Sequence, residues 1–360
     1  MFNVTYGVGS LLAGFLVDRF GPRRVILVGC LLLPIALAAS AAITTLWHLY
    51  FTVSLLSGLG VSFVAYVPVA ALLTATFEER RGLPLGIASA GVGVGILAML
   101  PLTQVVIDSA GWRAGYLAMA GMVAVVMLPL GFFIQRGETI QPPASARPPS
   151  GTELSAKVSK SITDWTLASA LRNQEFWLIM CTFTLLNGPV QLILTHQVAH
   201  LVEVGHPKIL VVGIVGLVGL VSVPGKILWG FLSDRWWLEL IYLAGIGCMV
   251  AAMFLLLWMT PASPVWGLYL YAILMGMGYA VSPAMTPIVS GRFFAGSHFG
   301  VIFGALNMVY HSGGAAGIWL AGYAHDVTAS YRLPLLGSIL SATLAACCAW
   351  LIAPRRIPPR

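Results

Sequence analysis

The chain alternates long apolar stretches with short polar connections. A transmembrane helix needs about 20 predominantly apolar residues, and reading from one polar or proline-rich break to the next predicts eleven such helices. The predicted spans are approximately 2–18, 24–43, 47–76, 83–108, 112–134, 175–201, 209–232, 238–259, 264–289, 298–322 and 333–353. Because almost all connections are short, we expect neighbouring helices to run antiparallel.

One long segment, 135–174, interrupts this pattern. It is rich in Pro, Ser and Ala and has no apolar period, which is typical of a flexible linker. It divides the chain into an N-terminal helical half, 1–134, and a C-terminal helical half, 175–360. Near its end we expect a short helix in the membrane interface, capped by Thr163 and Asp164. The residues of that helix are Trp165, Leu167, Ala168 and Leu171.

The composition requires lipid as the solvent. Of 360 residues, 59% are hydrophobic and 9% are charged, and the mean hydropathy is +0.91. Soluble domains carry roughly 25% charged residues, so this chain cannot cover a globular surface with polar groups. The five cysteines lie in apolar runs without disulfide or zinc spacing, and we interpret them as small buried hydrophobic residues. No metal or other cofactor is expected.

The distribution of basic residues predicts the orientation in the membrane. The net charge is +7, but Lys and Arg are scattered over short loops without a basic stripe, so no nucleic-acid partner is expected. Counted over alternate loops, fifteen of them lie on one side and three on the other. The positive-inside rule then places the linker and the C-terminus in the cytoplasm, and eleven spans place the N-terminus outside. We expect a monomeric, multi-pass protein of the cell's inner membrane.

The two halves share a motif. GFLVDR at 14–19 recurs as GFLSDR at 230–235, each at the cytoplasmic end of a predicted span. GWRAGY at 111–116 has a weaker counterpart in ASYRLP at 329–334. Two related halves of six spans each would place these segments in parallel register.

These residues carry a family resemblance. The full segment GFLVDRFGPRR, residues 14–24, resembles the signature loop between helices 2 and 3 of the major facilitator superfamily, and GFLSDR resembles its counterpart between helices 8 and 9. The likeness implies an all-α polytopic membrane protein of two six-helix halves. Eleven of the twelve helices are then present, with helices 2 to 6 in the first half and 7 to 12 in the second. Within the superfamily, three segments resemble the oxalate/formate antiporters and the monocarboxylate transporters, namely VPGKILWGFLSDR, THQVAHLVEVG and YHSGGAAGIWLAGYAHDVTASYR.

One full charge lies deep within a predicted span. Lys226 is eight residues before Asp234, hence roughly 12 Å along the helix at about 1.5 Å per residue. An ionised side chain at mid-bilayer costs about 2.5 to 3.5 kcal/mol on insertion scales, which makes it a functional candidate. The resemblance implies a substrate-binding arginine at this place, and a lysine keeps its charge but not its bidentate geometry. The alternative is a structural lysine bonded to loosened carbonyls beside Pro224 and Gly225.

The acidic residues are informative by their positions. All twelve Asp and Glu residues fall in predicted loops or within a few residues of a span end. Where the monocarboxylate carriers place an aspartate, four residues before Lys226, this chain has Ser222, so the resemblance does not imply Asp-assisted proton coupling. Exporters of cationic drugs and many sugar/proton symporters need a buried carboxylate. A cavity with Lys226 and no counter-charge favours an anionic substrate instead, with a proton or a counter-anion as the coupled species.

Histidine is the other candidate for coupling, because its pKa near 6.5 lets it change charge at physiological pH. His311 lies mid-span, close to the place of a substrate-binding lysine in the oxalate/formate antiporters, and is interpreted either as a ligand or proton carrier or as a satisfied core histidine. His196 and His200 lie toward the outer end of a span and are read as interfacial histidines. Four further polar residues either line the same cavity or bond between helices, namely Asn187, Gln191, Tyr66 and Gln104.

The two motif copies are candidate gates. The resemblance implies that the first copy forms an interhelical charge cluster that holds the inner gate in one state, and a merely topogenic loop is the alternative. The residues of the first copy are Asp18, Arg19, Arg23 and Arg24. The second copy, Asp234 and Arg235, lacks the terminal Gly and the paired Arg, so we expect it to be the weaker lock.

Three classes of function remain open at this stage. The first is alternating-access transport of a small organic anion, a mono- or dicarboxylate, anchored by Lys226. The second is export of drugs or other amphipathic compounds. The third is a membrane enzyme or a non-transporting receptor, although no HExxH, GxSxG or paired intramembrane carboxylate supports an enzyme. Helix 1 has no counterpart, so we expect a truncated chain or a misplaced start codon, and poor transport by the chain as given.

Overall fold

The computed structural model describes residues 1–77, 81–136 and 165–352. Within those ranges the chain is helical and contains no strand, which confirms the predicted all-α fold. Each of the eleven predicted segments coincides with a helical stretch. Eight stretches in the described part are long and apolar enough to cross a membrane. The long α6 counts as one of these eight although it contains two predicted spans, and α1 and α13 are not among them.

The N-terminal half has two local departures from straight helices. Its elements are α1 (Phe2–Phe20), α2 (Pro22–Ser40), α3 (Leu46–Leu49), the π-helix η1 (Tyr50–Leu56), α4 (Ser57–Val64), α5 (Tyr66–Thr76) and α6 (Gly82–Arg136). The predicted turn within α6 falls at Gly111, where φ is 81°, a conformation that glycine adopts without penalty. The break between α4 and α5 is at Ala65, with φ −91° and ψ −138°. Pro68 explains this break, because its ring clashes with the carbonyl of Val64 and it has no N–H to donate.

Most spans of the C-terminal half begin and end within two residues of their predicted bounds, but the helices predicted at 264–289 and 298–322 extend to Phe294 and Thr328. Its elements are α8 (Leu167–Ala170), α9 (Gln174–Glu203), α10 (Lys208–Ser233), α11 (Leu238–Trp258), α12 (Val265–Phe294), α13 (Phe299–Thr328) and α14 (Arg332–Ile352). The short helix α8 was predicted with the wrong cap. Its N-cap is Thr166, whose hydroxyl oxygen accepts a 3.2 Å bond from the N–H of Ser169. The predicted caps Thr163 and Asp164 lie outside the described residues.

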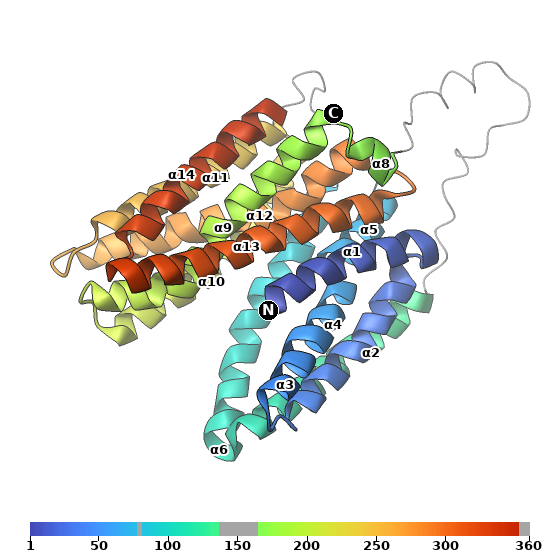
Figure 1. Ribbon diagram of the computed structural model, residues 1–360, viewed down its shortest axis with the longest axis horizontal. Coiled ribbons are helices and arrows are strands. Elements are labelled where there is room, and N and C mark those ends of the chain that lie inside the picture. Colours follow the sequence, from blue (N-terminus) through green and yellow to red (C-terminus); the bar gives the residue numbers. More distant parts are fainter. Residues whose placement is uncertain (78–80, 137–164, 353–360) are drawn as a thin grey trace, which may run out of the picture.

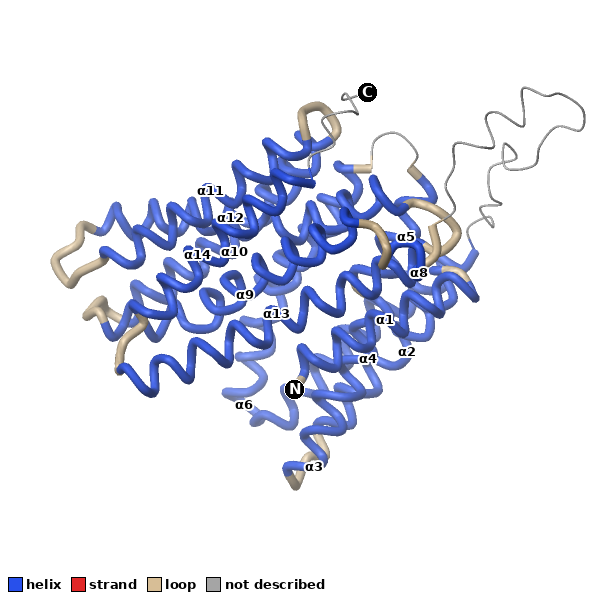
Figure 2. Tube along the Cα trace, turned by 45° about the horizontal axis from the view of Figure 1, so that its top comes forward, coloured by secondary structure: helices blue, strands red, loops and turns tan. Residues whose placement is uncertain are grey.

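The two halves meet along two pairs of helices. α1 packs against α13, and the first part of α6 packs against α10. In Figure 1 the helices of the two halves come together near α5 and α8 and diverge toward their other ends. Figure 2 shows the same arrangement from a second direction, with α1 running alongside α13.

Small residues permit these close approaches. Gly86 of α6 lies against the backbone of Lys226 in α10, where an added Cβ would come within 2.6 Å of the carbonyl oxygen. Gly313 of α13 likewise lies against Thr184 of α9. Such contacts replace the hydrophobic driving force that is missing between helices in lipid.

Hydrophobic packing is unequal between the halves. The largest buried cluster joins α9 to α14 within the C-terminal half. A smaller cluster crosses between the halves and consists of Val67, Ala70, Leu85, Phe299 and Phe303. The rings of Phe299 and Phe303 in that cluster are stacked, with centroids 5.5 Å apart. This cluster seals the end of the molecule where the two halves converge.

Candidate functional site

Lys226 occupies the inward face of α10. The buried positions around it, Ser222, Gly225, Trp229 and Gly230, recur every three or four residues, which is the spacing of one helix face. The side chain of Lys226 is 0% exposed. Its ammonium nitrogen has no hydrogen-bond partner among the described residues and lies 4.7 Å from the centre of the Tyr279 ring. The structure therefore does not show the carbonyl bonds that the structural-lysine interpretation requires.

Tyr279, which contacts Lys226, is one of four tyrosines from four helical segments. Tyr279 comes from α12 and Tyr310 from α13, while Tyr6 comes from α1 and Tyr66 follows the break that ends α4. The phenol of Tyr66 lies near those of Tyr279, Tyr310 and Tyr6. These four residues, which we call the tyrosine cluster, bring uncharged phenols from both halves together, and Tyr279 joins the cluster to the buried Lys226.

His311 completes the central site. Its ring centre is 4.0 Å from that of Tyr6 and 5.2 Å from that of Tyr310. The side chain is 5% exposed, and neither ring nitrogen has a hydrogen-bond partner in the part of the chain described. Within the described ranges, His311 is therefore not a core histidine whose polar atoms are satisfied. His311 belongs to the C-terminal half and contacts Tyr6 of the N-terminal half. It therefore lies at the interface between the two halves.

Asn187 is the third buried polar group with spare bonding capacity. Its amide nitrogen donates to the carbonyl of Tyr310 at 2.7 Å, while its amide oxygen has no partner among described residues. A buried polar atom without a partner costs about 1 to 3 kcal/mol. Three residues with such atoms, Lys226, His311 and Asn187, meet around the tyrosine cluster, and this concentration is typical of a ligand site.

Two of the remaining predicted site residues lie at the central site, and one lies away from it. Gln191 is half-buried on α9. Gly314 of α13 lies against both Gln191 and Asn187, because a Cβ added at Gly314 would lie 2.8 Å from the Gln191 Cγ and 2.6 Å from the Asn187 amide nitrogen. Gln191 therefore adjoins the site. Tyr66 is part of the site. Gln104 is exposed and donates to Asp108 at 2.7 Å, one turn along its own helix. The structure thus does not bring Gln104 to the site.

Sequence reasoning missed Tyr6, Tyr279 and Tyr310. Each lies in an apolar span, where tyrosine reads equally well as a packing residue. A weak signal existed in the pair Tyr310 and His311, because two adjacent polar rings in mid-span need partners. The convergence of four tyrosines depends on tertiary packing between helices that lie far apart in sequence.

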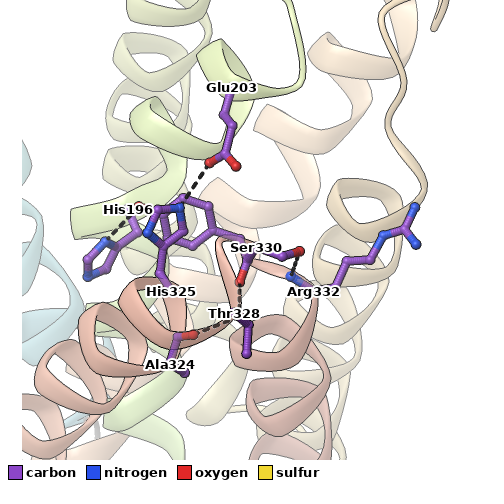
Figure 3. A network of polar contacts seen from close by, with 8 residues as sticks. His196, Glu203, Ala324, His325, Thr328, Ser330 and Arg332 are labelled. Carbon is purple, nitrogen blue, oxygen red and sulfur yellow. Dashed lines mark hydrogen bonds and ion pairs between the residues drawn. The ribbon is translucent and has the colours of Figure 1, made fainter.

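The outer histidines form a separate cluster, shown in Figure 3. His325 contacts Glu203 at 3.1 Å and stacks on Tyr331 at 4.2 Å between ring centres. His196 approaches the Tyr331 hydroxyl at 3.4 Å. His200 packs on the same ring. Burial raises the pKa of the Tyr331 hydroxyl, so it stays protonated. Nine residues of helix separate His196 from Asn187, about 14 Å at 1.5 Å per residue, so this cluster lies away from the central site.

Asp18 and Asp234 bind the opposite half of the molecule. The two oxygens of Asp18 accept bonds from the backbone N–H groups of Gly300 and Val301, both at 2.8 Å, at the start of α13. The two oxygens of Asp234 accept bonds from the N–H groups of Gly82 and Leu83, at 2.8 and 2.9 Å, at the start of α6. A helix N-terminus carries partial positive charge and unpaired N–H groups, so a carboxylate is stabilised there. We call this end of the molecule the aspartate end.

The arginines of the two motif copies take different positions. The guanidinium of Arg19 lies 5.3 Å from the centre of the Phe20 ring, and that of Arg235 lies 3.9 Å from the Phe231 ring. Arg24 is exposed and Arg23 is half-buried. The sequence predicted a weaker second copy, but both aspartates make the same pair of backbone bonds. The bonding therefore shows no difference between the copies, because the donor in each case is a helix start rather than the missing arginine.

The buried carboxylates of the described part lie away from Lys226. Glu239 is 9% exposed and is the second residue of α11. It lines a small space with Thr182 and Tyr242. Glu239 thus lies within two residues of a helix start, as its place in the sequence predicted. The local charge around the central site is set by Lys226.

Comparisons with known proteins agree with this architecture. The sequence model described as the Major Facilitator Superfamily matches residues 1–318. Monocarboxylate transporter 13 of Bos taurus is 28% identical over 340 residues, which cover 90% of this chain and 72% of that protein. Monocarboxylate transporter 11 of Homo sapiens is 26% identical over 369 residues, covering 98% of this chain and 72% of that protein.

Solved structures show the same fold. The fucose:proton symporter of E. coli superimposes with a TM-score of 0.75 at 14% identity, covering 98% of this chain and 89% of that one. The proton:xylose symporter, bound to a bromodeoxyglucose, gives the same TM-score and identity, with 98% and 85% covered. At this identity the likeness concerns the fold alone.

Proposed function

This chain belongs to the Major Facilitator Superfamily, and we propose that it is a secondary active transporter of a small organic anion, a mono- or dicarboxylate, working by alternating access. The observation that carries the proposal is the unpartnered ammonium of Lys226, 0% exposed, at the interface of two helical halves. An isolated buried cation is costly unless it is paired. A carboxylate substrate supplies the missing pair and takes hydrogen bonds from the tyrosine cluster.

The relatives support the same substrate class. Those reported above are named as monocarboxylate transporters. The hydroxyl groups of the tyrosine cluster suit a carboxylate, because they donate hydrogen bonds to its oxygens. An exporter of amphipathic compounds fits less well, because its substrate would leave Lys226 unpaired.

The membrane orientation follows from the basic residues. The positive-inside rule places the aspartate end in the cytoplasm, together with the linker and the C-terminus. Because the bonds of Asp18 and Asp234 join the halves at that end, we interpret this conformation as closed to the cytoplasm. The central site then takes up its anion from the outside, and the halves rock about it.

Uptake by reconstituted protein tests the function. Proteoliposomes are offered labelled mono- and dicarboxylates, with and without a pH gradient, and protein-free vesicles correct for diffusion of the neutral acids. We expect saturable uptake of at least one carboxylate, and no uptake of labelled cationic or neutral sugar substrates. Saturable transport of a cationic drug with no response to any carboxylate would contradict the proposal.

We propose His311 as the group that couples a proton to transport. An imidazole can bind and release a proton, and the two ring nitrogens of His311 have no hydrogen-bond partner among the described residues. The His311→Asn variant is therefore expected to lose stimulation by a pH gradient while it still exchanges one anion for another. The measurement is uptake at several external pH values beside anion exchange at equal pH. Because His325 at the outer cluster is also ionisable, His325→Asn is the matched control, and an unchanged pH profile in His311→Asn would remove His311 from the coupling step.

A further inference from the structure

An apolar cavity adjoins the central site. It has a volume of about 150 Å³ and lies between the α4/α5 break, the first turns of α6 and the helix α12. Its walls include Val69, Leu85, Ser89, Val92 and Pro287. Because α12 belongs to the C-terminal half, the cavity spans the interface between the halves. The proposed anion site does not by itself explain a space with this lining.

The lining makes the cavity suited to hydrocarbon. Ser89 supplies a hydroxyl, but that group is directed at the carbonyls of Leu85 and Pro283, at 2.8 and 3.2 Å. The other side chains named above are apolar. A cavity of about 150 Å³ lined by apolar side chains stays dry and holds a benzene ring in a well-studied soluble protein. The space here is therefore the size of a six-carbon group.

Tyr66 connects this cavity to Lys226. Tyr66 lines the cavity, and its phenol lies near that of Tyr279. The ammonium of Lys226 in turn lies 4.7 Å from the centre of the Tyr279 ring. The helix that forms the cavity wall also packs on the lysine, because Gly86 lies against the Lys226 backbone. The interface between the halves therefore holds, in this order, the ammonium of Lys226, the phenols of Tyr279 and Tyr66, and the apolar cavity.

We infer that this cavity is the subsite for an apolar tail of about six carbon atoms, so that the substrate is a monocarboxylate with its charge at Lys226 and its tail against Tyr66. The inference rests on the proposed function, since it assigns the carboxylate to Lys226. It excludes dicarboxylates, because a second charge would have to enter the apolar cavity. The subsite depends on the break at Ala65. If α4 and α5 formed one continuous helix, the backbone would run straight on at Tyr66 without the interruption beside which this cavity lies.

Binding of a series of acids to the purified protein tests the subsite without depending on transport. Sodium acetate, butyrate, hexanoate and phenylacetate are titrated, and the thermal shift gives each dissociation constant. Burial of one methylene group is expected to strengthen binding roughly fourfold. Hexanoate should then bind roughly fifteenfold more tightly than butyrate. Phenylacetate should resemble hexanoate, while succinate should not bind.

Two variants separate the tail from the charge. Ala88 lines the cavity and is exposed, so Ala88→Phe fills the space from its mouth without a buried clash. It should weaken hexanoate and phenylacetate at least tenfold and leave acetate within about twofold, as expected from lost methylene burial. Ala98→Phe, an exposed position of the same helix, is the matched control. Lys226→Ala should weaken every acid.

Each outcome has one meaning. Equal binding of all four acids by the unaltered protein would overturn the subsite and leave the proposed function standing. The same holds if Ala88→Phe, folded as judged by its thermal transition, keeps the preference for long tails. Equal binding of the acids by the unaltered protein and by Lys226→Ala would overturn the proposed function instead, and the tail assignment with it.

Discussion

Replacing Lys226 by alanine is expected to lower carboxylate transport at least tenfold. A hydrogen bond to a charged group is worth about 1.5 to 3 kcal/mol, and each 1.4 kcal/mol is tenfold in an equilibrium constant. Loss of the cation removes the pair that offsets burial of the substrate's charge. Lys226→Arg keeps the charge and should retain part of the transport, although a planar guanidinium does not fit the space of an ammonium.

The controls for this prediction come from the same helix. Lys208, at the far end of α10, is exposed, so Lys208→Ala tests the loss of one positive charge without loss of the anchor. Uptake of the carboxylate identified in the proteoliposome panel is measured for each variant at matched amounts of reconstituted protein. Normal uptake by a correctly inserted Lys226→Ala variant would contradict the role of Lys226 as the anion-binding residue. Loss of uptake in Lys208→Ala as well would point to a general effect of charge.

Apolar spacing predicted most of the helical fold because each span must satisfy its own backbone bonds in lipid. The bounds of α10, α11 and α14 agree with the predicted segments to within one or two residues. The break at Ala65 was not foreseen, although Pro68 is visible in the sequence. Many transmembrane helices tolerate proline with a modest kink, so its position alone did not predict a full interruption or the cavity beside it.

The sequence predicted those members of the candidate site that can carry a charge. Lys226 and His311 are conspicuous because an ionisable group in an apolar span needs an explanation. Tyr6, Tyr279 and Tyr310 were not predictable, because a tyrosine costs little free energy in a membrane-spanning helix and its role depends on what it faces. Gln104 illustrates the opposite error, since a polar residue in a span can bond to its own helix, as it does to Asp108. Which polar groups converge is a tertiary property.

Equal bonding at the two motif copies leads to a prediction that the sequence alone would not have made. Asp18 and Asp234 are 216 positions apart, and each bonds the first N–H groups of a helix in the other half. A change to asparagine keeps the size of the side chain but removes its charge, and its NH₂ group faces N–H donors. Each substitution should therefore shift the equilibrium away from the state closed at the aspartate end by roughly 10- to 150-fold, from about 1.5 to 3 kcal/mol per charged bond lost.

Distances between spin labels across the aspartate end measure this shift. Labels at Phe77→Cys and Trp236→Cys, both exposed and on opposite halves, are introduced after the native cysteines have been replaced. We expect a single short distance in the parent protein, and a growing population at longer distance in Asp18→Asn and in Asp234→Asn. Asp326→Asn, an exposed carboxylate near the end of α13, is the control. If Asp234→Asn leaves the distribution unchanged while Asp18→Asn alters it, the second copy is the weaker lock despite its matching bonds. If neither alters it, the aspartates do not hold the gate, and the hydrophobic contact of Phe299 and Phe303 with α5 and α6 must close that end instead.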